Sequence, residues 1–266
     1  MKRTVWMLAL LLGLGLSAVE TADARNPKAQ SRAGKITNDV VIDVNNISMF
    51  ATNQGSFAWD IGGGGSGLEF PKGTGKTAVF ASGLWIGGKV NDDLRVVVAE
   101  YSFEYKPGPI LPDGTPANPD DDRYRVFKIN RGDGPENPDY AQWPIEDGAP
   151  ANADGTPQVL GDQTIWTVYN DGNESGHTNM QTKPLGIEVQ QTTFAFNRTG
   201  PLGNVIFVKF KLINKGGNLI DSTYVSLWSD PALGQFDNDL VGSDWEYEVR
   251  VNTPEANWKR KQKGRS

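Results

Sequence analysis

Apolar residues recur at every second position in several segments of this chain, which is the pattern of β-strands with one buried face. In residues 204–214 the alternating apolar positions are Ile206, Val208, Phe210 and Leu212. The alternation resumes over residues 223–228, after the turn sequence Asn214-Lys215-Gly216-Gly217. Because asparagine and glycine favour tight turns between strands, we expect these two segments to form a hairpin.

Further strand patterns lie upstream, and the chain shows almost no helical period. Residues 77–86 and 94–105 flank the turn-forming run 87–93, which predicts a second hairpin. More strands are expected in residues 123–129, 165–169 and 187–196. These patterns predict an all-β fold, an antiparallel β-sandwich-like domain with long irregular loops.

Two of the expected loops, residues 106–122 and 130–161, are long and rich in Pro, Gly, Asp and Asn. Loops beyond about 12–15 residues in a compact domain are usually functional or flexible. The two segments therefore either carry a recognition surface or wrap over the sandwich as solvated crossovers.

The first 24 residues have the features of a secretory signal peptide. Lys2 and Arg3 form a basic start, residues 8–16 form an apolar run too short to span a bilayer, and Ala22-Asp23-Ala24 is a small-x-small cleavage site. We expect cleavage after Ala24, a secreted or outer-surface location, and no transmembrane segment once the signal is removed.

The net charge of −6 is unevenly distributed. Residues 250–266 contain six basic residues and one acidic residue, so the preceding part of the chain is strongly acidic. An acidic body disfavours nucleic acid as a partner, because phosphate binding needs a basic surface. Cations and glycans remain compatible with it. The chain has no cysteine, which excludes disulfides and zinc–thiolate sites.

An acidic loop toward the end of the chain is the best candidate for a metal site. Its carboxylates are Asp230, Asp237, Asp239 and Asp244. Oxygen-rich, flexible clusters of this kind suit Ca²⁺. The spacing does not fit an EF-hand, because Val241 stands where a fifth-position ligand is needed and no helix flanks the loop. An irregular calcium site and a solvated acidic loop are the two alternatives.

The only histidine, His177, lies in the polar loop 171–177. A catalytic triad needs a placed nucleophile and base, and histidine-ligated metal sites usually use more than one imidazole. We therefore expect His177 to be solvated, and the sequence assigns no catalytic residue.

Tryptophans and carboxylates together raise an alternative function. The five tryptophans concerned, most of which lie on strands, are Trp59, Trp85, Trp143, Trp166 and Trp228. Aromatic rings and a pair of carboxyl groups across a cleft are the ingredients of glycan binding or glycoside hydrolysis. Burial in the sandwich core explains most of these tryptophans more simply. A cleft with two carboxylates and an exposed tryptophan would favour a carbohydrate-binding or glycoside-hydrolysing domain.

Several segments carry a resemblance to a protein family. They are NNISMF (45–50), GLEFP (67–71), ASGLWIGG (81–88), GDQTIWTVYND (161–171), PLGIEV (184–189) and DLVGSD (239–244). Over residues 40–244 the chain resembles the N-terminal region of large secreted or cell-surface proteins of Bacteroidetes-type bacteria. The resemblance implies a parent protein with fibronectin type III-like or other β-sandwich modules and a sorting domain for type IX secretion.

The same resemblance implies a structural or binding role, with surface glycans or other domains of the parent protein as partners, and assigns no catalytic residue. It ends at Asp244. We accordingly divide the chain into a signal peptide (1–24), a β-sandwich-like extracellular region (25–244) and a basic tail (245–266). The tail offers no apolar face to bury, so we expect it to be disordered or non-native, as in a truncated or frameshifted gene product.

Overall fold

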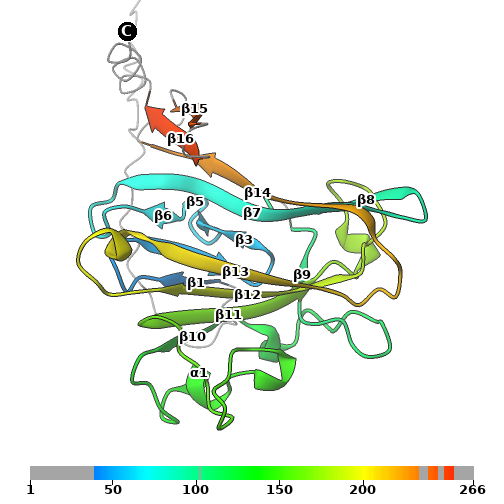
Figure 1. Ribbon diagram of the computed structural model, residues 1–266, viewed down its shortest axis with the longest axis horizontal. Coiled ribbons are helices and arrows are strands. Elements are labelled where there is room, and N and C mark those ends of the chain that lie inside the picture. Colours follow the sequence, from blue (N-terminus) through cyan, green and yellow to red (C-terminus); the bar gives the residue numbers. More distant parts are fainter. Residues whose placement is uncertain (1–38, 102, 234–238, 245–248, 255–266) are drawn as a thin grey trace, which may run out of the picture.

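Two antiparallel sheets pack face to face in the computed structural model (Figure 1), which describes residues 39–101, 103–233, 239–244 and 249–254. The first sheet has the order β1-β2-β3-β7-β14, and the second has the order β10-β11-β12-β13. The prediction of an all-β, sandwich-like fold is therefore confirmed.

The strands of the first sheet are β1 (Asp39–Ile42), β2 (Ser48–Thr52), β3 (Ser56–Phe57), β7 (Thr77–Val90) and β14 (Asp221–Pro231), with β6 (Leu68–Glu69) and β8 (Asp93–Val98) paired beside them. Those of the second sheet are β10 (Phe127–Asn130), β11 (Gln163–Asn170), β12 (Ile187–Ala195) and β13 (Ile206–Asn214), with β9 (Lys106–Pro107) beside β11.

Small elements complete the described part of the chain. Two ribbons have two strands each: β4 (Trp59–Asp60) with β5 (Gly65–Ser66), and β15 (Asp239–Asp244) with β16 (Val249–Pro254). The helical turns are α1 (Pro138–Ala141) and the 3₁₀ turns η1 (Asp122–Tyr124), η2 (Ile145–Asp147), η3 (Glu174–Gly176) and η4 (Pro201–Asn204). Strand β16 lies within the predicted basic tail (245–266). It pairs with β15, which belongs to the predicted extracellular region and ends at Asp244.

The core lies between the sheets, where alternate residues of each strand meet. Leu84 and Ile86 of β7 pack against Tyr169 of β11 and Val189 of β12. A second cluster joins β1 and β2 to the same strands through Ile42, Met49 and Ile165. All eight residues of β11 are buried, which requires cover on both of its faces.

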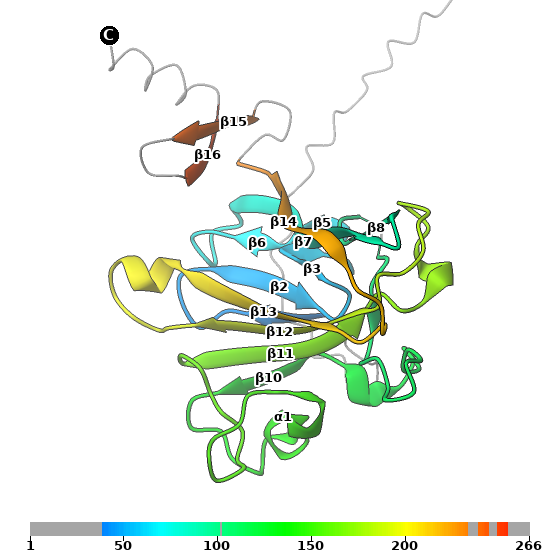
Figure 2. The same cartoon turned by 45° about the vertical axis from the view of Figure 1, so that its right-hand side comes forward.

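The loop 130–161 supplies that second cover. Trp166 and Val168 of β11 and Phe127 of β10 pack against Trp143 and Ala149 of the loop. In Figure 2 this segment, with α1, lies beneath β10 and β11 as an additional layer. The loop thus wraps over the sandwich, and it does so as a layer with an apolar core of its own instead of a solvated crossover. A recognition surface on this loop stays a prediction.

The two predicted hairpins have different outcomes. Strands β7 and β8 pair around a two-residue turn at Asn91 and Asp92, as expected. The hairpin expected between residues 204–214 and 223–228 is wrong, because β13 pairs with β12 whereas β14 pairs with β7. The connection after β13 crosses from one sheet to the other, so the two strands that follow each other in sequence belong to different sheets.

Candidate functional site

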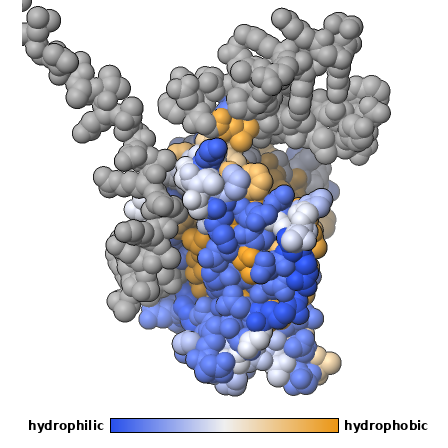
Figure 3. Space-filling model, turned by 90° about the vertical axis from the view of Figure 1, so that its left-hand side faces the viewer, coloured by the Kyte–Doolittle hydropathy of each residue, from blue (hydrophilic) through white to orange (hydrophobic). Residues whose placement is uncertain are grey.

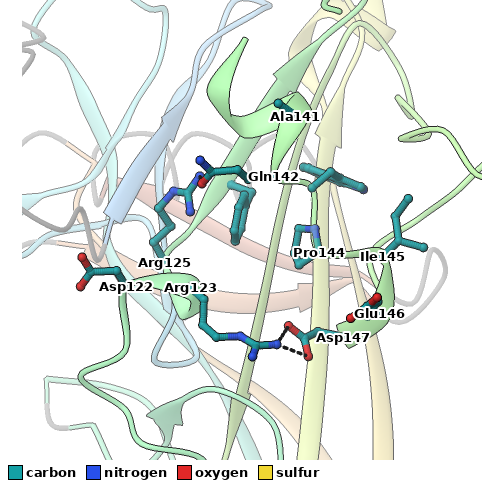
Figure 4. A pocket seen from close by; sticks show the side chains of 11 residues that line it. Asp122, Arg123, Arg125, Ala141, Gln142, Pro144, Ile145, Glu146 and Asp147 are labelled. Atoms are coloured by element: carbon teal, nitrogen blue, oxygen red, sulfur yellow. Dashed lines mark hydrogen bonds and ion pairs between the residues drawn. The ribbon is translucent and has the colours of Figure 1, made fainter. Parts of the chain in front are cut away.

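A surface pocket of about 580 Å³ opens between the loop layer and β10 (Figure 4). Its walls come from η1, α1 and η2. Local capping fixes these turns, since the Asn137 side chain accepts a hydrogen bond from Asp139 N (2.9 Å) and Pro138 occupies the first turn of α1. The Asp121 side chain caps η1 in the same way by accepting from Arg123 N (3.0 Å).

Two arginines dominate the pocket, and both are paired. Arg125 lies over the ring of Phe127 at 4.0 Å and donates to Asp139 Oδ1 at 2.9 Å and to Gln142 Oε1 at 3.1 Å. Arg123 reaches Asp147 Oδ2 at 3.2 Å, as Figure 4 shows. The hydrogen bond with Asp147 raises the pKa of Arg123. The positive charge of the pocket is therefore largely neutralised by its own carboxylates.

Trp143 lines the pocket but offers little of its ring to solvent. It is 6% exposed, and its Nε1 donates to Pro150 O at 2.9 Å. Trp166 is also buried, whereas Trp59, Trp85 and Trp228 are half-buried. None of the five tryptophans is exposed. A sugar ring stacking on the pocket would need an accessible aromatic face, which Trp143 lacks.

The prediction that His177 is solvated is wrong. Its ring is buried, with Nε2 at 2.9 Å from Asp171 O and at 3.8 Å from Asp171 Oδ2. Its Nδ1 has no hydrogen-bond partner among the described residues. The loop begins in the interior because Asp171 directly follows the fully buried strand β11 and is itself buried.

Asp171 joins three stretches of backbone. Its carboxylate accepts hydrogen bonds from Leu185 N and Ile187 N, both at 2.6 Å, and its carbonyl oxygen faces His177. Burial raises the pKa of the Asp171 carboxyl, and the hydrogen bonds from Ile187 and Leu185 oppose that shift. Both carboxylate oxygens are therefore occupied by the protein itself.

Glu104 has a similar arrangement in the interior. It is fully buried, and its carboxylate accepts from the backbone N–H groups of Val98 (3.0 Å), Asn179 (2.9 Å) and Met180 (2.7 Å). The side chain thus fastens the loop around Asn179 to the end of β8. The burial of Glu104 was not predicted. The residue lies in the segment 94–105 that was expected to be one strand, whereas β8 ends at Val98 and the burial of Glu104 depends on contacts with residues 179–180.

Glu188 on β12 is the third buried carboxylate. It accepts from Ile110 N (3.0 Å), Gln190 Nε2 (3.0 Å) and Lys215 Nζ (2.5 Å). Lys215 also donates to Ile110 O at 3.1 Å, so the pair connects the loop after β9 to the loop after β13. The signal available in the sequence was a charged residue inside the apolar run 187–189, which requires a buried partner.

The four predicted calcium ligands are only partly covered by the structure. Asp230 accepts a hydrogen bond from Tyr101 Oη, and Asp239 Oδ2 accepts from Leu233 N at 2.8 Å. Asp237 lies outside the described residues, and the Asp244 side chain is not described. No cluster of three or more potential ligands occurs among the described side chains. The calcium site therefore stays a prediction.

The surface character differs between the regions just described. In Figure 3 the lower part of the molecule, which contains the loop layer, is mostly hydrophilic, while apolar residues gather higher up. Within the described ranges, no helix is long and apolar enough to cross a membrane.

Comparison with known proteins adds no assignment. No protein family matches the chain, and no match was found among curated proteins or solved structures.

Proposed function

We propose that this chain is a structural or binding module of a larger bacterial protein that acts outside the cell. The observation that carries the proposal is the bonding of the buried carboxylates. The carboxylates of Glu104 and Asp171 accept hydrogen bonds from backbone N–H groups, and that of Glu188 accepts from Ile110 N and from the side chains of Gln190 and Lys215. All three hold loops against the sandwich. The oxygens of these carboxylates therefore serve to position loops.

The expected secretory signal at residues 1–24 and the resemblance over residues 40–244 support the same role. A chain without cysteine must be held together by packing, and its net charge of −6 disfavours nucleic acid as a partner. The partners that fit this role are surface glycans or other domains of the parent protein.

Glycoside hydrolysis is the rival function, and the pocket gives it a defined test. The purified chain is incubated with a panel of soluble and insoluble polysaccharides, and released reducing ends are measured. We expect no release above background. Release that is abolished by Asp147→Asn, but kept by the exposed control Asp154→Asn with unchanged melting, would replace the module proposal with a hydrolase.

A further inference from the structure

Strands β13 and β14 are the edges of their sheets on the same side of the molecule. Among the described strands, β14 pairs with β7 alone and β13 with β12 alone. The chain passes from β13 to β14 at the right of Figure 1, so the two strands run in opposite directions. An unpaired edge presents a row of backbone N–H and C=O groups that can pair with another strand.

Two apolar side chains on the inner face of β14 are uncovered. Leu227 is registered with Leu84 of β7, and Val225 with Ile86. Directly paired residues point to the same side of a sheet, so Val225 and Leu227 point toward the core as Leu84 and Ile86 do. Leu84 and Ile86 are buried, yet Val225 is 53% and Leu227 55% exposed.

The reason for this exposure is an offset between the sheets. The second sheet ends at β13, whose Phe210 and Leu212 pack against the core cluster that contains Leu84 and Ile86 of β7. Strand β14 lies one strand farther out and has no strand opposite it among the described residues. The first sheet therefore overhangs the second by one strand, β14. The step that this overhang leaves is bounded by the inner face of β14 and by the free edge of β13.

We propose that this step is a self-association surface, occupied by a second copy of the chain. A half-turn about an axis parallel to the strands places the overhang of each copy over the step of the other. Each β13 then pairs antiparallel with the partner's β14, and the two uncovered apolar faces meet at the axis. A two-fold arrangement of this kind is self-complementary and closed.

Charge favours pairing of β13 with the partner's β14 over pairing of β13 with the partner's β13. The charged residues of β13 are Lys209 and Lys211, whereas those of β14 are Asp221 and Asp230. Antiparallel pairing of β13 with a second β13 would bring lysines opposite lysines, which is destabilising. Pairing of β13 with β14 brings strands of opposite charge together.

The inference adds a second copy of the chain to the partners of the proposed module and so rests on that proposal. Its failure is distinguishable, because a monomeric chain would overturn the self-association while leaving the module role intact. Hydrolysis of a polysaccharide would overturn the module role while leaving the self-association intact.

Sedimentation of the exported, purified chain over a wide concentration range tests the inference. We expect a monomer–dimer equilibrium whose dissociation constant rises by at least about tenfold in Leu227→Lys, because an unpaired ammonium would be buried at the axis. The matched control is Leu94→Lys, which alters a similarly exposed leucine on β8. A chain that remains monomeric, or a dimer weakened equally by both variants, overturns the proposal.

Cross-linking fixes the strand pairing and does not depend on the folding of Leu227→Lys. Since the chain has no cysteine, Lys211→Cys and Ser226→Cys each introduce a single thiol at an exposed strand position. A short bis-maleimide should join the two variants when they are mixed, and neither variant alone, since identical positions lie on opposite outer faces of the dimer. A cross-link formed by Ser226→Cys alone would contradict the pairing.

Discussion

A buried carboxylate keeps its charge only where hydrogen-bond donors replace the lost water. In this protein the donors are mostly backbone N–H groups, so each buried acid determines the path of a loop. Glu104 positions residues 179–180, and Asp171 positions residues 185–187. The residues that deserve substitution are therefore those at the centres of these small networks.

Glu104→Gln should lower the free energy of unfolding by about 2–3 kcal/mol, because an amide has one acceptor oxygen where three backbone donors converge. Urea unfolding at neutral pH measures the change. Glu136→Gln, at an exposed position, is the control and should stay within about 0.5 kcal/mol of the parent protein. Equal effects of the two substitutions would show that Glu104 has no special role.

Asp162 predicts a dependence of stability on pH. The hydrogen bond from Arg131, at 2.6 Å, lowers the pKa of this carboxyl, with help from Asn197 N and Arg198. A carboxyl whose pKa is lowered in the folded state stabilises it above the unfolded pKa, about 3.9, and loses that contribution as pH falls through the folded pKa.

Asp162→Asn should therefore cost about 0.5–1 kcal/mol at pH 7, a modest value because the pair is close to solvent. The cost should shrink as the carboxyl is protonated. Melting both proteins from pH 7 down into the acid range tests this. A difference that is independent of pH would assign the effect of the substitution to geometry instead of charge.

At the scale of the elements, the turn between β7 and β8 has a specific conformation. Asn91 and Asp92 both have positive φ, 52° and 64°, which is the geometry of a type I′ hairpin turn. Asparagine and glycine tolerate it, whereas a β-branched residue does not.

Asp92→Gly should leave stability unchanged or raise it slightly, whereas Asp92→Val should lower it by about 1–2 kcal/mol. Chemical unfolding of the two variants compares them at one position, so each is the control for the other. If valine were tolerated as well as glycine, the positive φ at this position would not be needed for the hairpin.

The sequence predicted most of the long strands, because alternation reports one buried face directly. The strands β7, β11, β12 and β13 lie where the pattern placed them. The pairing of β13 with β14 was wrong because a six-residue connection can close a hairpin or cross between sheets, and alternation is the same in both cases. The burial of His177 and Glu104 depends on contacts between distant loops, which local pattern does not record.

The site was less predictable than the fold. The acidic loop stood out by composition alone, whereas the pocket beside Arg125 is assembled from three short turns. Two of them, α1 and η2, lie in the long loop 130–161, and η1 lies largely in the segment 123–129 that was predicted as a strand. The capping residues Asn137 and Asp121, which fix two of these turns, were not predicted from the sequence.

At the scale of the whole molecule, bound calcium would link the acidic loop to stability. If the carboxylates near Asp237 and Asp239 form a site, calcium at about 100 times its dissociation constant should add roughly 2.7 kcal/mol to the free energy of unfolding. Melting with calcium and then with a chelator measures the effect. Identical midpoints, for the parent chain and for Asp237→Ala with Asp239→Ala, would leave the solvated acidic loop as the remaining alternative.

The central claim is that the protein is an exported module, and the N-terminal residue of the protein outside the cytoplasm tests it most directly. Cells expressing the full chain are fractionated, and the exported protein is analysed by N-terminal sequencing and intact mass. The account predicts a chain that begins at Arg25, after cleavage behind Ala24. A protein that stays in the cytoplasm and begins at the original N-terminus would contradict it.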